Sequence, residues 1–587
     1  MRILLLTHSF NSLSQRLYAE LTARDHHVSV ELDISDAVTE DAVRLFRPDV
    51  IVAPFLKRAV PESVWRRCLC LIVHPGIRGD RGPSALDWAV LRQERRWGVT
   101  VLQAEAEMDA GPVWAWREFP MRNTRKSSLY RFEVTEAATA AVLEAIGRKS
   151  AGDWSPRPVD DHDTEVRGSW QDAMRQADRR IDWASDDTAT VLRKIYSGDG
   201  NPGVVDEICG EAVRVFDAHA EEHLRGSPGA LIAHRNDAVC RATVDGAIWL
   251  GRLRPIDADA STFKLPASRV LAAQIATLPE NRLPLAAAAS FSTYRDIAYV
   301  ERDRVGYLTF DFYNGAMSTA RCRRLLEAYR YAVSRPTRVI VLMGGADFFC
   351  NGLDLNLIEA AQSPADESWA NINAMDDLAE AIINTTSHAT IAALAGNAGA
   401  GGVFLALAAD RVLVRDGVVL NPHYKNMGNL YGSEYWTYLL PKRVGRDGIE
   451  AVMGNRLPLL ASNAVGMGLA DYLGPGERHA FHAEATTLAS DLANGAGFTR
   501  LLRIKRRSRR EDEHRKPLRA YREQELARMR LNFYGFDPSY HVARFRFVHR
   551  TPHAWTPLFL AAHRRLGWQP PVSPATREAG GAVRIAS

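Results

Sequence analysis

Apolar and polar residues follow two alternating patterns over residues 1 to 150. Short apolar runs, which predict strands, begin at positions 2, 28, 49, 70, 98 and 112. Stretches with apolar residues at helical spacing lie between them, among them 12–26 and 84–95. Strands that alternate with helices are typical of a doubly wound parallel sheet, so we expect an α/β domain over residues 1–150.

A second, smaller unit is expected over residues 166–265. A Pro- and Asp-rich stretch at 150–165 precedes it and predicts a linker. One helix is expected at 188–196, followed by short strands at 212–220, 229–234, 238–244 and 247–255. Several short strands with turn residues between them favour a small β-barrel-like domain. Residues 266–292, rich in Ala, Pro and Leu, predict a second linker.

A third unit is expected over residues 293–478. Apolar runs at 298–303, 305–312 and 339–345 predict strands, with a helix at 319–333. From 479 to 587 the pattern is helical and strongly charged, and the composition after Pro571 is typical of disorder. The chain is therefore a multidomain α/β protein with a helical C-terminal extension, which we expect to hold the two halves together.

Composition excludes several classes of function. The net charge of +4 over 587 residues is too small to indicate a nucleic-acid partner, and we interpret the basic run at 503–510 as a solvated helix face. No apolar run approaches the roughly 20 residues of a membrane span, and the N-terminus lacks a signal-peptide pattern. The six cysteines have no metal-ligand spacing, so we expect no metal site and a cytoplasmic location.

Two polar residues follow predicted strands in the first domain. His74 begins the motif HPGIRGDRGP, and Asp109 lies in a Met-Asp-Ala-Gly turn. Side chains at the carboxyl ends of parallel strands line the crevice where α/β proteins bind ligands. Taken alone, His74 could equally be a capping or core histidine. Together with Asp109 it predicts an acid/base pair.

These segments carry a family resemblance. DVIVAPFLKRAVP, HPG..GDRGP and WGVTVLQ....MDAG resemble the N10-formyltetrahydrofolate-dependent transferases and hydrolases. RIDWASDDTATVLRKIYSGDGNPG resembles the C-terminal domain of methionyl-tRNA formyltransferase, so the resemblance covers residues 1–265. It implies formyl transfer by His74 and Asp109, and a folate site that includes Phe55, Leu56, Lys57 and Arg81.

One position departs from the formyltransferase pattern. Ile72 stands where the family has an asparagine. Asparagine would donate a hydrogen bond to the tetrahedral oxyanion, and isoleucine has no donor. The departure suggests a different formyl acceptor, or an oxyanion stabilised by other donors such as the Gly76 amide or Arg81.

A glycine-rich segment dominates the second half of the chain. LAGNAGAGGVFLALAAD at 394–410 lacks the GKS or GKT ending of a phosphate-binding P-loop. With GGADFFCNGLDL at 344–355 it resembles the crotonase (enoyl-CoA hydratase/isomerase) superfamily over 296–475. The resemblance implies a crotonase-like α/β spiral domain. Backbone amides of Leu353 and Gly401 would form an oxyanion hole for a CoA thioester, with Gly352, Gly402 and Phe404 in the CoA pocket.

The side chains depart from the hydratase pattern. Phe404 stands where hydratases carry their first catalytic glutamate, and NPHYKNMG at 421–428 replaces the segment with the second. Hydration of an enoyl-CoA is therefore not expected. His423, Tyr424 and Glu434 are nearby groups that could move protons. Glu434 is the better base and Tyr424 the better donor, because tyrosine has a pKa of about 10. The structural alternatives are packing for Tyr424 and a helix salt bridge for Glu434.

The combination of both halves resembles the HypX (HoxX) family of hydrogenase maturation factors. The resemblance implies N10-formyltetrahydrofolate and coenzyme A as cofactors. The formyl group would pass to CoA, and formyl-CoA would then be split into CoA and the carbon monoxide ligand of [NiFe]-hydrogenase iron. Small molecules are the expected partners, with [NiFe]-hydrogenase maturation proteins as further candidates. We also expect an internal tunnel between the two sites.

Two alternatives stay open from the sequence. The formyl group could pass to an amine on a sugar, a tRNA or a protein, although Ile72 argues against this. The chain could also be a non-catalytic folate- and CoA-binding scaffold. Phe404 fits an inactive hydratase, whereas the presence of His74 and Asp109 favours activity in the first half.

Overall fold

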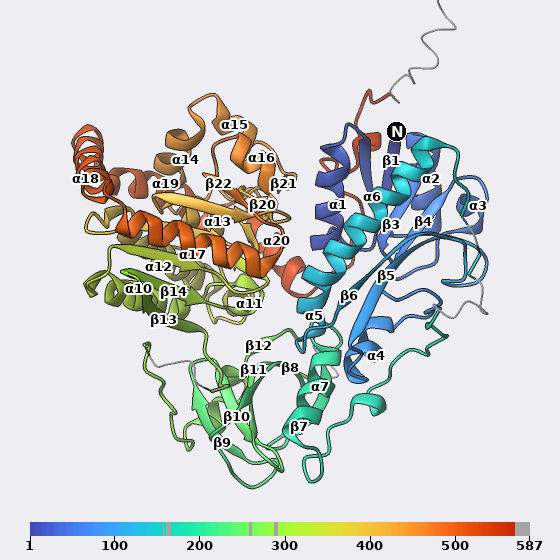
Figure 1. Cartoon of the computed structure of the whole chain (residues 1–587), viewed down its shortest axis with the longest axis horizontal. Helices are drawn as coiled ribbons and strands as arrows, with labels where there is room; N and C mark the ends of the chain where they lie inside the picture. The colour runs from blue at the N-terminus through green and yellow to red at the C-terminus, as the bar shows by residue number, and fades with distance from the viewer. Residues whose placement is uncertain (157, 160–165, 258–260, 287–290, 570–587) are drawn as a thin grey trace, which may run out of the picture.

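The computed structural model describes residues 1–156, 158–159, 166–257, 261–286 and 291–569. Figure 1 shows the N-terminal domain beside the crotonase-like part, with the small domain below both. Within the described ranges no helix is both long and apolar enough to cross a membrane. All six cysteines have free thiols. The expected disordered tail after Pro571 lies outside the described residues.

The N-terminal domain is one sheet in the order β2-β1-β3-β4-β5-β6. Its strands are β1 (Arg2–Thr7), β2 (His27–Leu32), β3 (Val50–Phe55), β4 (Cys70–His74), β5 (Arg96–Gln103) and β6 (Val113–Pro120). Its helices are α1 (Ser12–Thr22), α2 (Asp36–Phe46), α3 (Glu62–Trp65), α4 (Ala85–Leu91), α5 (Lys126–Leu129), the π-helix η1 (Tyr130–Val134) and α6 (Thr135–Ala151). All six expected strands are present.

The pairing in this sheet is parallel from β1 to β4 and antiparallel beyond it. β1 pairs in parallel with β2 and β3, and β3 with β4, as expected for a doubly wound sheet. β5 runs antiparallel to both β4 and β6. The short connection from β5 to β6 leaves no room for a crossover helix, so these two strands form a hairpin. The carboxyl ends of β1, β3 and β4 share one edge.

The small domain is an antiparallel sheet in the order β7-β8-β11-β10-β9, with β12 beside β11. Its elements are η2 (Ala177–Arg179), α7 (Thr188–Gly198), β7 (Val204–Ile208), β8 (Glu211–Glu221), β9 (Leu231–Arg235), β10 (Ala238–Ala242), β11 (Ala247–Pro255) and β12 (Leu265–Pro266). The short helices α8 (Ala267–Val270) and α9 (Ala272–Ile275) follow within the segment expected to be a linker. Ala267 and Leu271 are fully buried in the core of this domain.

The crotonase-like domain contains two sheets. One has the order β13-β14-β15-β17-β19-β22 and the other the order β16-β18-β20-β21. The strands are β13 (Ile297–Arg302), β14 (Val305–Phe310), β15 (Val339–Met343), β16 (Phe348–Cys350), β17 (Ala389–Leu394), β18 (Asn397–Gly399), β19 (Arg411–Arg415), β20 (Val419–Asn421), β21 (Leu459–Leu460) and β22 (Tyr472–Gly474). The helices are η3 (Tyr313–Gly315), α10 (Thr319–Ser334), α11 (Leu355–Glu359), α12 (Pro364–Asn384), α13 (Gly401–Leu407), α14 (Trp436–Val444), α15 (Gly448–Met453) and α16 (Ala461–Gly466).

The C-terminal extension contacts both halves of the protein. Its helices are α17 (Arg478–Asn494), α18 (Phe498–Arg515), α19 (Leu518–Tyr534) and α20 (Ser539–Val548), followed by η4 (Ala562–Arg564). α19 lies against α12 and α14 of the crotonase-like domain. The chain then reaches the N-terminal domain (Figure 1), where the Leu560 carbonyl accepts a hydrogen bond from Val30 at 3.0 Å and His563 Nε2 lies 2.9 Å from Glu31.

Candidate functional site

His74 and Asp109 meet at the carboxyl edge of the N-terminal sheet. His74 is the last residue of β4 and is buried. Its Nδ1 lies 3.4 Å from Asp109 Oδ2. Asp109 has a left-handed backbone, with φ +55°, and its carboxylate accepts a hydrogen bond from the Gly82 amide at 3.1 Å. The turn after β5 therefore aims Asp109 at the imidazole ring.

A third polar residue, Asp80, completes this group and was not among the expected site residues. Its Oδ2 lies 2.8 Å from His74 Nε2, so carboxylates face both ring nitrogens. Burial raises the pKa of Asp80, while the hydrogen bond with His74 opposes the rise. Gly76 makes the contact possible, because a Cβ atom there would lie 2.4 Å from both the His74 ring and the Asp80 carboxylate. The Gly-Asp pair in HPGIRGDRGP was the sequence feature from which Asp80 could have been identified.

The expected folate residues lie around the same edge. Phe55 ends β3, Leu56 follows it, and Lys57 is exposed. Leu56 and Ile72 pack against the same apolar cluster. Ile72 is two residues before His74 on β4, and alternate residues of a strand point to the same face. Arg81 lies farther along the loop, with its Nη1 at 2.8 Å from Glu107 Oε1.

In the second half, the two expected oxyanion-hole loops lie side by side. A Cβ atom on Gly352, whose φ is +81°, would lie 3.6 Å from the Gly401 nitrogen. Gly401 begins α13, so its amide has no acceptor within the helix. Ala400 before it has φ +47° and ψ −127°, a strained conformation for alanine. A Cβ atom on Gly402 would come within 2.0 Å of the Cys350 carbonyl, so glycine lets α13 approach β16.

Glu434 reaches this pair of loops from a distant part of the chain. A Cβ atom on Gly401 would lie 2.2 Å from Glu434 Oε1, so the carboxylate lies directly against the glycine. Glu434 Oε2 accepts a hydrogen bond from the Tyr424 hydroxyl at 2.6 Å. Phe404 is fully buried and stacks on the Tyr424 ring, with centroids 5.5 Å apart and an interplanar angle of 12°. The structure thus brings together four of the residues expected at this site, namely Gly401, Phe404, Tyr424 and Glu434.

The electrostatics of this site favour proton transfer. Burial, followed by the neighbouring charge of Asp376, raises the pKa of Glu434 to about 8. Burial and then the charge of Glu434 raise the pKa of Tyr424 well above its ordinary value. Near neutral pH the carboxyl group is therefore able to take or give a proton, whereas the phenol stays a hydrogen-bond donor.

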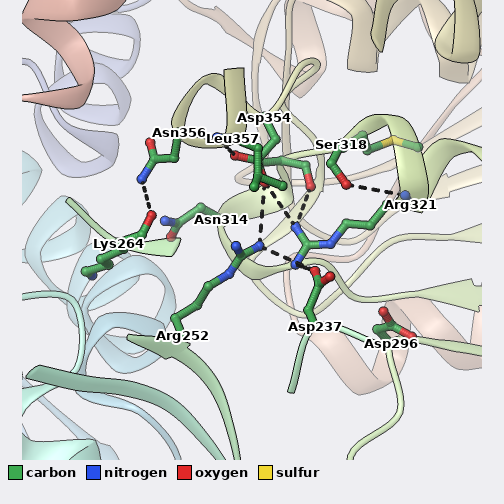
Figure 2. Close-up of polar contacts among 12 residues, drawn as sticks. Asp237, Arg252, Lys264, Asp296, Asn314, Ser318, Arg321, Asp354, Asn356 and Leu357 are labelled. Atoms are coloured by element: carbon green, nitrogen blue, oxygen red, sulfur yellow. Dashed lines mark hydrogen bonds and ion pairs between the residues drawn. The ribbon is translucent and has the colours of Figure 1, made fainter. Parts of the chain in front are cut away.

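A buried ion-pair network anchors the loop that carries the Leu353 amide. Asp354 is the next residue, and its side chain caps α11. Its Oδ2 lies 3.6 Å from an Arg252 nitrogen and 3.5 Å from an Arg321 nitrogen. Figure 2 shows both guanidinium groups also directed at Asp237, with 2.6 Å from Arg321 Nη2 to Asp237 Oδ2. Because Arg252 comes from β11 of the small domain, two domains together fix this loop.

Two consecutive residues of η1 connect the two sites. The Tyr130 ring lies edge-on to Phe55, with centroids 6.3 Å apart. The next guanidinium, of Arg131, lies over the Phe348 ring at 4.9 Å from its centroid. Phe348 begins β16, which leads to Gly352. The helix η1 therefore contacts both the end of β3, which precedes the folate loop, and the start of β16.

Three sequence models of protein families match the chain. Residues 10–146 match the formyl transferase family, and residues 173–265 match the formyl transferase C-terminal domain. Residues 304–531 match the enoyl-CoA hydratase/isomerase family, so that match includes α17, α18 and most of α19 of the extension as well. The described residues contain no cluster of three or more His, Cys, Asp or Glu side chains arranged to bind a metal.

Two relatives span nearly the whole chain. Hydrogenase maturation factor HoxX of Bradyrhizobium diazoefficiens is 53% identical over 564 residues, which is 96% of this chain and 97% of the relative. The crystal structure of HypX from Aquifex aeolicus in complex with tetrahydrofolic acid is 50% identical and has a TM-score of 0.94. It covers 97% of this chain and 100% of its own.

A more distant relative matches the first half alone. The methionyl-tRNA formyltransferase of Stenotrophomonas maltophilia is 26% identical over 235 residues, which is 39% of this chain and 75% of the relative. The HoxX and HypX proteins span the formyltransferase and crotonase-like modules together, at 53% and 50% identity. The chain therefore belongs to the HoxX/HypX family of hydrogenase maturation factors.

Proposed function

We propose that this protein makes carbon monoxide for [NiFe]-hydrogenase in two steps. The N-terminal domain transfers the formyl group of N10-formyltetrahydrofolate to coenzyme A. The crotonase-like domain then splits formyl-CoA into carbon monoxide and CoA. Family membership and the tetrahydrofolic acid bound to the Aquifex relative support the folate substrate. Both cofactors are cytoplasmic metabolites, so we place the protein in the cytoplasm, where other maturation proteins would receive the product.

In the first step, the CoA sulfur attacks the formyl carbon as a thiolate. His74 polarises the tetrahedral adduct, and Asp109 directs the thiol proton toward N10 as the C–N bond breaks. Asp80 and Asp109 hold the imidazole from both sides, at 2.8 Å and 3.4 Å. The products are formyl-CoA and tetrahydrofolate. A thiol acceptor fits the presence of Ile72, which leaves the site without the asparagine of amine-directed relatives.

In the second step, Glu434 takes the formyl hydrogen as a proton. The electron pair of that C–H bond becomes the carbon lone pair of carbon monoxide, and the C–S bond breaks with its electrons on sulfur. Glu434 then returns the proton to the thiolate, so atoms and charges balance. The amides of Leu353 and Gly401 would stabilise negative charge on the formyl oxygen. Tyr424, at 2.6 Å from Glu434, holds the carboxylate in place.

Phe404 excludes water from this step. Formyl-CoA that meets water gives formate instead of carbon monoxide. The buried ring takes the position of the glutamate that would activate water in a hydratase, and it covers the Tyr424 ring face. A site with one buried carboxylate and an apolar wall suits deprotonation without hydrolysis.

The contact of Glu434 with Gly401 and Tyr424 is the observation that carries this proposal. A cationic group in the domain junction supports CoA as the acceptor. Burial and the charges of Arg550, Arg131 and Arg254 together lower the pKa of Lys264 to about 7, although the charge of Asp199 opposes them. These cations would match the phosphates of CoA. The expected tunnel remains a prediction, and we place it beside Tyr130 and Arg131, which contact elements of both sites.

The acceptor is tested by supplying the purified protein with N10-formyltetrahydrofolate and either CoA or an amine such as glycinamide. Tetrahydrofolate formation is followed by absorbance and formyl-CoA by mass spectrometry. Tetrahydrofolate formation with CoA, together with formyl-CoA or the carbon monoxide that it yields, and no formylated amine, is the expected result. Formylated amine with no formyl-CoA would contradict the proposal and favour an amine-directed formyltransferase. No turnover with either acceptor would favour a binding scaffold.

A further inference from the structure

The loop that carries Glu434 is held by two buried carboxylates from other elements. Asp376 comes from α12, and Glu525 comes from α19 of the C-terminal extension. Both are fully buried, with exposures of 0%. Neither residue lies in the segments at 344–355 and 394–410 that resemble the crotonase superfamily, and neither has a role in the two proposed steps.

Asp376 accepts hydrogen bonds at the start of this loop. Its Oδ1 accepts the backbone N–H of Glu434 at 2.8 Å. The Ser433 hydroxyl lies 2.9 Å and 2.8 Å from the two carboxylate oxygens. The carboxylate thus fixes the peptide that leads directly into the Glu434 side chain.

Glu525 accepts hydrogen bonds at the end of the same loop. Its Oε2 accepts the backbone N–H of Tyr435 at 2.9 Å, and its Oε1 accepts that of Thr437 at 2.8 Å. The Thr437 hydroxyl also donates to Oε1, at 2.5 Å. One carboxylate therefore satisfies two backbone donors around the beginning of α14 (Trp436–Val444).

The backbone between these carboxylates is strained. Glu434 has φ +58° and Tyr435 has φ +60°, so two consecutive residues with side chains are in the left-handed region. Such conformations persist only where surrounding contacts impose them, and they concentrate at functional sites. The N–H groups of both residues donate to the buried carboxylates.

The buried carboxyl groups around Glu434 have too little positive charge beside them for a purely structural role. Three buried carboxyl groups, of Glu434, Asp376 and Glu525, lie together. The Arg522 Nε is 3.7 Å from Asp376 Oδ2, and its other nitrogens pair with the half-exposed Asp377 and Glu380. Burying carboxyl groups with so little positive charge beside them costs free energy. Neutral acceptors would bind the same N–H groups at a lower cost in free energy.

We propose that Asp376 and Glu525 are positioning residues for Glu434, so that helix α19 completes the decarbonylation site. This inference rests on the proposed function, in which Glu434 is the base. The carboxylates hold Glu434 against Gly401 and Tyr424, and the charge of Asp376 adds to its basicity. The C-terminal extension is then part of the catalytic machinery as well as a link between the domains.

The pH dependence of Glu434 is set by groups from several elements. They are Tyr424 from the loop after β20, Asp376 from α12, Glu525 and Arg522 from α19, Cys322 from α10 and Cys350 from β16. After burial, Asp376 is the largest influence that raises the pKa of Glu434. Removing that charge should lower the pKa, so the base would be ionised at lower pH.

Two substitutions of Asp376 separate charge from geometry. In Asp376→Asn the side-chain oxygen still accepts from the Glu434 N–H, and the amide group can donate to the Ser433 hydroxyl. We expect the rising limb of kcat against pH for carbon monoxide release from formyl-CoA to move to lower pH, with KM within about 2-fold. Asp376→Ala removes the acceptor, and we expect kcat to fall about 100-fold with little change in KM.

Glu525→Gln tests the contribution of α19. The amide has one oxygen, and its NH₂ group would face a backbone N–H, so one hydrogen bond is lost. We expect kcat to fall about 10- to 100-fold. The matched control is Glu523→Gln on the same helix, because Glu523 is exposed and pairs with Arg519. Formyl transfer to CoA, measured in the same preparations, should stay unchanged because that site lies in another domain.

Unchanged kcat and pH profiles in Asp376→Ala and Glu525→Gln would overturn the inference, as would losses confined to KM. If wild-type protein releases no carbon monoxide, the proposed function fails separately. A crystal structure of Asp376→Ala tests positioning without any activity. Displacement of Glu434 from the Tyr424 hydroxyl supports the inference, and an unchanged contact at 2.6 Å with the same φ overturns it.

Discussion

Replacement of Tyr424 by phenylalanine isolates the hydrogen bond at the centre of the second site. The change removes one oxygen atom. The ring stays stacked on Phe404, at 5.5 Å between centroids, so the apolar wall is retained. What is lost is the hydrogen bond from the hydroxyl to Glu434 Oε2, which is 2.6 Å long.

The size of the effect follows from the strength of that bond. A hydrogen bond to a charged group contributes about 1.5–3 kcal/mol. The bond favours the ionised form of Glu434, so its loss raises the pKa of this carboxyl further above about 8. The rise corresponds to about 1–2 pKa units. At pH 8 the ionised fraction would fall from about a half to between about a tenth and a hundredth, which lowers the rate about 5- to 50-fold.

The assay is the initial rate of carbon monoxide release from formyl-CoA, trapped on reduced haem, between about pH 6 and pH 10. In Tyr424→Phe the rising limb should move to higher pH, so the deficit against wild type should shrink as the pH rises toward about 10. Tyr329→Phe is the control, because Tyr329 is also buried and its hydroxyl bonds Thr385 at 2.8 Å, away from Glu434. A limb that stays in place, or moves to lower pH, would refute the role given to Tyr424.

Three further substitutions test other parts of the mechanism. His74→Ala should slow formyl transfer to CoA by about 100- to 10,000-fold while added formyl-CoA still yields carbon monoxide; loss of both activities would argue against two separate sites. Phe404→Ala should lower the free energy of unfolding by about 3–5 kcal/mol and produce formate beside carbon monoxide. Thermal unfolding and a formate assay measure these effects, and unchanged product would contradict the water-excluding role of Phe404. Arg131→Ala should raise the KM for CoA about 10-fold or more; an unchanged KM would place the CoA phosphates elsewhere.

The strands and the pair of His74 and Asp109 could be predicted because their signals are local. Strands buried on both faces are continuous apolar runs, and each expected run in residues 1–150 forms a strand. His74 ends β4, where position in the chain fixes position at the sheet edge. Asp109 reaches His74 through the loop after β5, because β5 is antiparallel and its own end lies beside the start of β4. The antiparallel direction of β5 could not be predicted, because an apolar run does not indicate which way its strand runs relative to its neighbours.

The supporting residues of the second site could not be predicted. Glu434 meets Gly401 only because two strained segments and α13 fold together. Asp376 and Glu525 are acidic residues on helices, a pattern that usually indicates a solvated face. Their burial depends on the packing of α19 against α12, which has no short-range signal.

The basic run at 503–510 also shows that the sequence alone does not reveal which helix residues are covered. Its interpretation as a solvated helix face holds for Arg507, whose side chain is 74% exposed. Lys505 and Arg509, however, dock on the crotonase-like domain: Lys505 pairs with Asp410 at 2.6 Å, and Arg509 donates to Asn384 at 3.0 Å. Helical spacing separates two faces of α18, and only the fold shows which face is covered.

In the proposed function, one chain converts a folate-bound formyl group into carbon monoxide. Purified protein supplied with N10-formyltetrahydrofolate and CoA, with reduced haem as the trap, tests it directly. We expect carbon monoxide and tetrahydrofolate in equal amounts, with CoA regenerated, and no carbon monoxide when CoA is omitted. Formate without carbon monoxide, or carbon monoxide at the wild-type rate from Glu434→Gln, would contradict the account.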